Sequence, residues 1–187
     1  MQEILNPAKA AELRAAFIKA FVDTSTTRYK AIEREKPTDI VYNDHYIHLY
    51  LWDTLYQKTF DVIPFRRAIE VISEKQRVYS LWDIRPRDIV FTTEFTFGKP
   101  WLTPPPKPRY LKLYESDTVI KWDADELMVL LEKELGDYAS SNGLETSIAE
   151  DLYVFDDSVS WCVIFTHEAI DGERYCLLCR RETDRLT

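Results

Sequence analysis

The sequence predicts an α+β fold in which N-terminal helices pack on a mainly antiparallel sheet. The first observation is the stretch from Asp151 to Arg180, where three runs of β-branched, aromatic and aliphatic residues are separated by two turn signals. The second is apolar residues at helical spacing near the N-terminus. The third is size and composition, because 187 residues of which 45% are hydrophobic can bury a sizeable core. We expect a single α+β domain over residues 1–187.

The C-terminal stretch is expected to form a three-stranded meander. Its strands are predicted at residues 152–156, 161–168 and 175–180, and the second hairpin turns at Asp171-Gly172, where positive φ is tolerated. Counting outwards from that turn pairs Ile170 with Glu173, and then His167 with Cys176, Phe165 with Leu178, and Ile164 with Cys179. Both faces of the second strand are apolar, so helices or loops should cover each side of the sheet. One face should hold Trp161, Val163 and Phe165, and the other Cys162, Ile164 and Thr166.

Besides helical pieces expected at residues 28–35 and from about residue 44, three helices are predicted. Asn6-Pro7 can start the first, since Asn caps free amides and Pro fits the first helical position. Residues 64–75 predict the second. Residues 123–135 predict the third, in which Asp123 can serve as the cap and Glu126 stands three residues later. Further strands are expected at 77–84, 88–97 and 110–114, with a proline-stiffened surface loop at 99–109.

Charge and composition exclude several functional classes. The net charge of -8 comes from interleaved acidic and basic residues, which disfavours a nucleic-acid surface. It is compatible with a basic protein partner, but simple solubility is the commoner reason for such a charge. No window is long and apolar enough for a membrane span, and the N-terminal residues do not resemble a signal peptide, so a cytoplasmic location is expected. The four glycines never cluster, which removes the glycine-rich nucleotide loops. We expect no cofactor.

Two pairs of residues have metal-ligand spacing. Cys176 and Cys179 lie in a predicted strand, where residues three apart point to opposite faces, so buried structural cysteines are expected there and at Cys162. His45 and His48 would share one face of a helix and could bind a metal together, although half-buried packing is the commoner role for such a pair. The expectation is no metal, with His45 and His48 as the alternative.

Four polar residues near the ends of the first predicted hairpin could carry chemistry. Asp156 and Asp157 belong to its turn, whereas His167 and Glu168 lie at the far end of the next strand, too distant to form one site with them. His167 with Glu168 remains as an alternative acid–base pair. The expected roles are turn formation, together with a contact surface at the aspartates.

Two tryptophans are expected at the surface. Trp101 lies in the proline-rich segment and Trp122 has polar neighbours in the sequence, and exposed aromatics ringed by charges are typical of protein-binding surfaces. We therefore predict Trp101, Trp122, Asp156 and Asp157 as parts of a surface that binds a protein partner.

The motifs DLYVFDDSVSWCVIFTHE, RVYSLWDI and YLWDTL resemble small uncharacterised bacterial domain families. Such families look like the accessory proteins encoded beside polymorphic toxins, whose immunity proteins are cytosolic, acidic and non-catalytic. The resemblance implies a bacterial protein that neutralises a toxin domain by binding it, and it assigns no residue a role. The alternative is a small hydrolase or metal-dependent enzyme using His167 with Glu168 or His45 with His48. A purely structural or regulatory domain is a third reading that the sequence leaves open.

Overall fold

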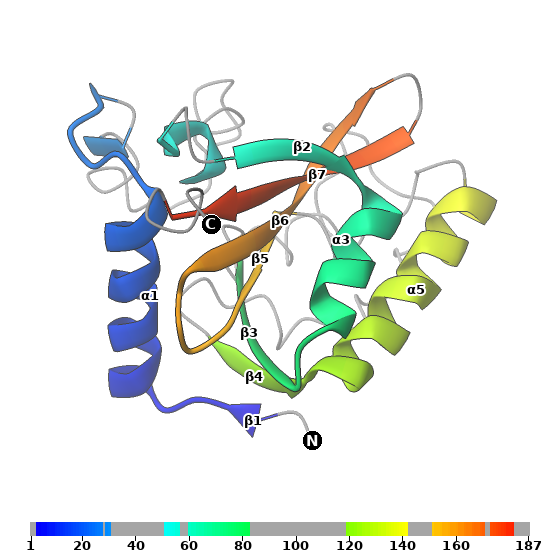
Figure 1. Cartoon of the computed structure of the whole chain (residues 1–187), viewed down its shortest axis with the longest axis horizontal. Coiled ribbons are helices and arrows are strands. Elements are labelled where there is room, and N and C mark those ends of the chain that lie inside the picture. The colour runs from blue at the N-terminus through cyan, green and yellow to red at the C-terminus, as the bar shows by residue number, and fades with distance from the viewer. Residues whose placement is uncertain are drawn as a thin grey trace, which may run out of the picture.

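A computed structural model describes residues 3–27, 29–30, 51–56, 60–82, 119–141, 151–170 and 173–181, with the backbone alone at 82, 134–141 and 167–170. Within these residues the chain forms three layers, with a sheet between helices on its two sides (Figure 1). The predicted α+β class is confirmed.

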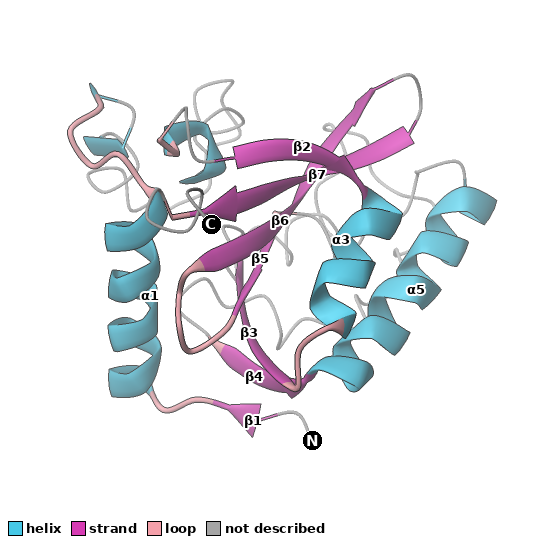
Figure 2. Ribbon diagram, in the orientation of Figure 1, coloured by secondary structure: helices cyan, strands magenta, loops and turns pink. Residues whose placement is uncertain are grey.

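The central layer is a seven-stranded sheet in the order β1-β4-β3-β5-β6-β7-β2, and each strand is antiparallel to its neighbours (Figure 2). The predicted meander β5-β6-β7 forms three adjacent strands of this sheet, with β5 in the middle position and β7 next to the edge strand β2. The bounds are β1 Glu3–Ile4, β2 Phe60–Pro64, β3 Arg77–Trp82, β4 Ile120–Asp123, β5 Leu152–Phe155, β6 Trp161–Ile170 and β7 Glu173–Arg180.

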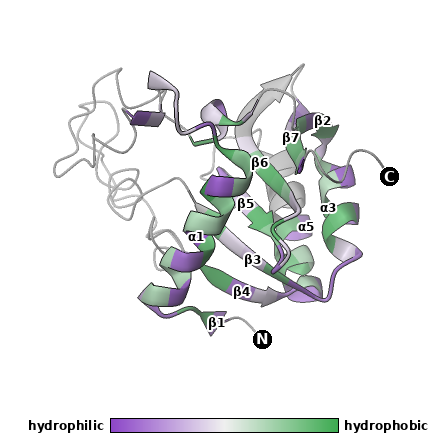
Figure 3. Ribbon diagram, turned by 60° about the vertical axis from the view of Figure 1, so that its left-hand side comes forward, coloured by the Kyte–Doolittle hydropathy of each residue, from purple (hydrophilic) through white to green (hydrophobic). Residues whose placement is uncertain are grey.

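The two faces of the meander are as predicted. Trp161, Val163 and Phe165 belong to the hydrophobic core on one side of the sheet, whereas Cys162 and Ile164 belong to the core on the other. All of these side chains are buried. Alternation along an extended strand explains the division, since successive side chains point to opposite faces. Hydrophobic residues are concentrated along the strands between the helical layers (Figure 3).

The predicted register of β6 and β7 holds only next to the turn. Ile170 pairs with Glu173 as expected, but beyond an irregularity between Phe165 and Ala169, Cys176 pairs with Phe165 and not with His167. Leu178 and Cys179 are displaced in the same way and pair with Val163 and Cys162 in place of Phe165 and Ile164. The β6 strand carries two extra residues in this bulge. A shift of two equals the side-chain period of a strand, so the face assignments survive although the pairing does not.

Helix α1 (Pro7–Phe21) covers one face of the sheet. Its cap is as predicted, because the Asn6 side chain accepts a hydrogen bond from the Lys9 backbone N–H at 3.0 Å and Pro7 occupies the first helical position. Phe17 and Phe21 are fully buried against the sheet, where Phe17 contacts Tyr153 with ring centroids 5.3 Å apart. The short 3-10 helix η1 (Leu51–Thr54) lies in the same core.

Helices α3 (Phe65–Ser73) and α5 (Ala124–Ser141) pack side by side on the opposite face (Figure 1). Both were predicted, although α5 begins one residue later than expected, because Asp123 is the last residue of β4, and ends at Ser141 rather than at residue 135. Ala124, Leu127 and Leu131 turn inwards from α5 and are buried. This inward stripe fixes which residues of α5 face outwards. No described helix is long and apolar enough to cross a membrane.

Three strands escaped prediction, namely β1, β2 and β4. They contain only two to five residues, too few for a clear alternating pattern, and β1 and β2 lie at the two edges of the sheet. The strands expected at 88–97 and 110–114 and the proline-rich segment at 99–109 lie outside the described residues.

Candidate functional site

The β5–β6 turn, residues 156–160, contains both aspartates for which a surface role was predicted. The Asp156 carboxylate accepts hydrogen bonds from the Ser158 backbone N–H at 3.0 Å and the Trp161 indole Nε1 at 2.6 Å, and also from the Ser158 hydroxyl. The Asp156 carbonyl accepts from the Val159 N–H at 3.0 Å. A carboxylate that bonds the backbone two residues on forms an Asx turn. Asp156 therefore builds the turn and anchors Trp161.

Val159 in this turn adopts a left-handed backbone conformation, with φ at 46°. That region is unfavourable for a β-branched residue and costs about 1–3 kcal/mol. The Val159 side chain is nonetheless 4% exposed and packs in the core beneath α1. Burial of Val159 and the hydrogen bonds of Asp156 together hold the strained turn in one conformation.

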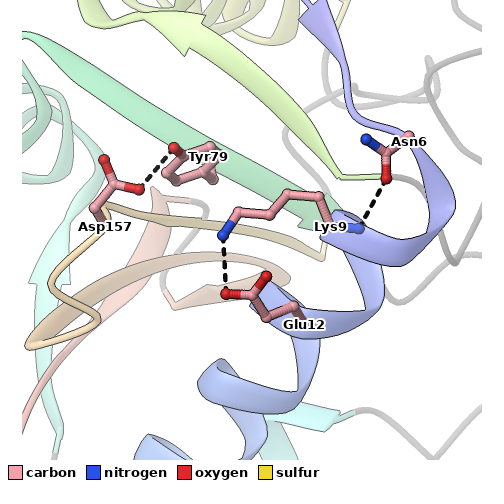
Figure 4. A network of polar contacts seen from close by, with 5 residues as sticks. All are labelled: Asn6, Lys9, Glu12, Tyr79 and Asp157. Carbon is pink, nitrogen blue, oxygen red and sulfur yellow. Dashed lines mark hydrogen bonds and ion pairs between the residues drawn. The ribbon is translucent and has the colours of Figure 1, made fainter.

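Asp157 is exposed and ties the turn to strand β3. Its carboxylate accepts a hydrogen bond of 2.7 Å from the Tyr79 hydroxyl (Figure 4). Burial of Tyr79, together with this hydrogen bond, raises the pKa of the phenol to about 12. The same view includes the start of α1, where Lys9 donates to Glu12 at 2.9 Å. Of the two aspartates, Asp157 is the more accessible to a partner.

The predicted exposure of Trp122 is wrong. Trp122 lies in β4, is 4% exposed and donates its indole N–H to the Ser80 hydroxyl at 2.7 Å. Its polar neighbours Lys121 and Asp123 misled the prediction, because in a strand they point to the other face and say nothing of the environment of Trp122. Trp122 is a core residue and is therefore not part of the predicted binding surface. Trp101 lies outside the described residues.

The two histidine pairs remain predictions. His167 and Glu168 lie in the bulged part of β6, where the structure describes the backbone alone. His45 and His48 lie outside the described residues. Among the residues whose side chains are described, no group of three or more His, Cys, Asp and Glu could hold a metal ion.

The three cysteines are buried free thiols, as predicted. Cys176 and Cys179 point to opposite faces of β7, which confirms the strand argument against a shared metal. Burial raises the pKa of Cys176 to about 12 and raises the pKa of Cys162 well above its usual range. A thiol with a raised pKa is rarely ionised near neutrality, so these groups are poor nucleophiles in the native state.

The outward side of α5 was missed by sequence reasoning. Val129 is 69% exposed, more than any other large hydrophobic side chain of the described residues. Exposed charged residues lie within one helical turn on both sides of it. We call this set the α5 surface; it consists of Asp125, Glu126, Val129, Glu132 and Lys133.

The α5 surface is acidic and only partly explained by helix stability. Three carboxylates and one ammonium give it two net negative charges at neutral pH. Asp125 and Glu126 lie in the first turn, where they complement the positive end of the helix dipole. No such argument covers Val129 and Glu132. The signal was present in the sequence, because the spacing of Leu127 and Leu131 places Val129 on the opposite side of the helix.

Comparison of the chain with protein families, with curated proteins and with solved structures gives no match.

Proposed function

We propose that this protein is non-catalytic and acts by binding another protein through the α5 surface. The observation that carries the proposal is the exposure of Val129 in the interior of a helix. A β-branched residue has a lower helix propensity than alanine, and an exposed one contributes little to the core. Helix stability therefore gives no reason for valine here, whereas a contact with a partner does.

The charges around Val129 favour a basic partner. An apolar side chain within a charged rim is the usual arrangement of a binding surface, and complementary charges accelerate association. Asp157 belongs to a different region of the molecule, at the β5–β6 turn, and its exposed carboxylate supports a second contact only if the partner is large enough to reach it.

In its most specific form, the proposal is that the chain is a cytoplasmic immunity protein of a bacterium and occludes a toxin domain. We call this the immunity version. The support for this version is the resemblance of the C-terminal strands to accessory domains encoded beside polymorphic toxins. An acidic surface suits this role where the toxin binds a negatively charged substrate, because the immunity protein then presents charges of the same sign as that substrate.

A parallel capture experiment tests the proposal. The tagged chain, Val129→Arg and Val62→Arg are incubated with lysate of the source organism, and bound proteins are identified by mass spectrometry. Val62 is the matched control, since it is 56% exposed but lies on β2 at the sheet edge. We expect one stoichiometric protein bound by wild type and Val62→Arg but lost from Val129→Arg. Equal recovery by all three variants, or no partner at all, overturns the α5 surface as the binding site.

The immunity version has its own test. The captured partner is purified and its activity measured with increasing amounts of the chain. Inhibition that is complete at one equivalent supports toxin neutralisation. A partner whose activity is unaffected leaves the binding proposal intact and eliminates the immunity version.

A further inference from the structure

Cys162 and Cys179 face each other across the adjacent strands β6 and β7. They are direct register partners in β6 and β7, both side chains are fully buried, and both belong to the core beneath α1. The bulge produced this pairing, because the register counted from the turn would have placed Ile164 opposite Cys179. Two free thiols on adjacent strands and on one face form a dithiol unit rather than two isolated cysteines.

The backbone geometry of the pair suits a crosslink. Arg181 donates its N–H to the Ser160 carbonyl at 3.0 Å, and these residues are two steps from Cys179 and Cys162, so Cys162 and Cys179 are also a hydrogen-bonded pair. The Cα atoms of such pairs lie about 5.5 Å apart. That separation falls within the roughly 4.4–6.8 Å that disulfides span.

We propose that Cys162 and Cys179 form a reversible cross-strand disulfide when the protein meets a peroxide oxidant. One sulfur attacks the peroxide, becomes a sulfenic acid and releases water. The second thiol then displaces the hydroxyl group from that sulfur, which forms the S–S bond and releases a second water. Two thiols together lose two protons and two electrons, and one hydrogen peroxide is reduced to two waters.

Two features make the reaction slow and reversible. Both thiols are fully buried, so a peroxide reaches them only after a local opening of the sheet. Such an opening is accessible because β7 is separated from the sheet edge by the five-residue strand β2. The Cβ atoms of a hydrogen-bonded pair are also somewhat farther apart than a relaxed disulfide prefers. A bridge that draws the strands together is strained and is reduced more readily than a structural one.

Cys176 provides a control within the same strand. It is as fully buried as Cys179, but it lies on the opposite face, opposite Phe165. It has no thiol partner in reach, so a bridge that depends on the cross-strand geometry must exclude it.

The test is disulfide mapping of the full chain. Reduced protein is exposed to hydrogen peroxide, remaining thiols are alkylated under denaturing conditions, and the products are analysed by intact-mass and peptide mass spectrometry. We expect a loss of two hydrogens, a peptide linking Cys162 to Cys179 and an alkylated Cys176, with full reversal by dithiothreitol. The same bridge is expected in Cys176→Ser and in neither Cys162→Ser nor Cys179→Ser.

Three outcomes would overturn the proposal. These are a bridge that includes Cys176, a disulfide between two copies of the chain, and thiols that remain reduced or pass to sulfinic acid without a bridge. The mapping of the wild-type chain decides among them even if a cysteine variant fails to fold.

Discussion

Asp156 is expected to stabilise the fold through Trp161 rather than to bind a partner. Its carboxylate accepts the Trp161 indole N–H at 2.6 Å, and Trp161 is 7% exposed, so Asp156→Ala leaves a largely buried donor without its acceptor. A hydrogen bond to a charged group contributes about 1.5–3 kcal/mol, and the bond to the Ser158 N–H, which is exposed to solvent, adds about 0.5–1.5 kcal/mol. Because Asp156 is only half-buried, we expect the free energy of unfolding to fall by roughly 2–3 kcal/mol.

The assay is urea denaturation followed by far-ultraviolet circular dichroism, which is insensitive to the loss of a tryptophan fluorophore. Asp156→Ala, Trp161→Phe and the double variant form a thermodynamic cycle. The expected coupling free energy is about 1–2 kcal/mol, since both single variants remove the same bond. A coupling within about 0.5 kcal/mol of zero would refute the anchoring role. Asp156→Asn serves as the control, and its amide retains one acceptor oxygen, so it should lose less stability than Asp156→Ala.

Three further predictions concern single contacts. The pKa of Tyr79 is raised to about 12 in the folded state, so its contribution to stability is complete below pH 10 and is lost as the pH rises from about 10 to about 12. In urea titrations, wild type should therefore lose more stability over that pH range than Tyr79→Phe. Parallel stability curves would contradict the burial of Tyr79 and its hydrogen bond to Asp157. Val129→Ala should increase the free energy of unfolding by about 0.5 kcal/mol through helix propensity, and a loss of stability would show that Val129 supports the fold. Trp122→Phe should lower it by about 2–3 kcal/mol because the buried Ser80 hydroxyl loses its donor, and a cost below about 0.5 kcal/mol would contradict that bond.

Helices and strands could be predicted from the sequence where the repeating pattern of apolar residues extended over many positions. The meander and helices α1, α3 and α5 were found from sequence because alternation or helical spacing persisted over several turns or pleats. The short strands β1 and β4 carry no such signal and form because neighbouring strands supply their hydrogen bonds. The bulge in β6 was also beyond sequence reasoning, since nothing local distinguishes a two-residue insertion from a continuous strand.

The candidate site was less predictable because exposure depends on which face a residue occupies. Trp122 was wrongly predicted to be exposed because its sequence neighbours are polar, although in a strand those neighbours point to the opposite face. Asp156 and Asp157 were correctly placed in a turn, but their bonds to Trp161 and Tyr79 depend on the register of the strands around them. The exposure of Val129 could have been predicted by projecting the predicted helix at residues 123–135 down its axis, because Val129 then lies opposite the apolar face.

The role of Val129 in binding can be measured by isothermal titration calorimetry, as the affinity of the captured partner for wild type, Val129→Ala and Val62→Ala. Binding through the α5 surface predicts a dissociation constant at least about tenfold higher for Val129→Ala, equivalent to about 1.4 kcal/mol, and a value close to wild type for Val62→Ala. If Val129→Ala binds as tightly as wild type, the α5 surface is not the binding site, because the exposed valine would then have no role in the fold or in the complex.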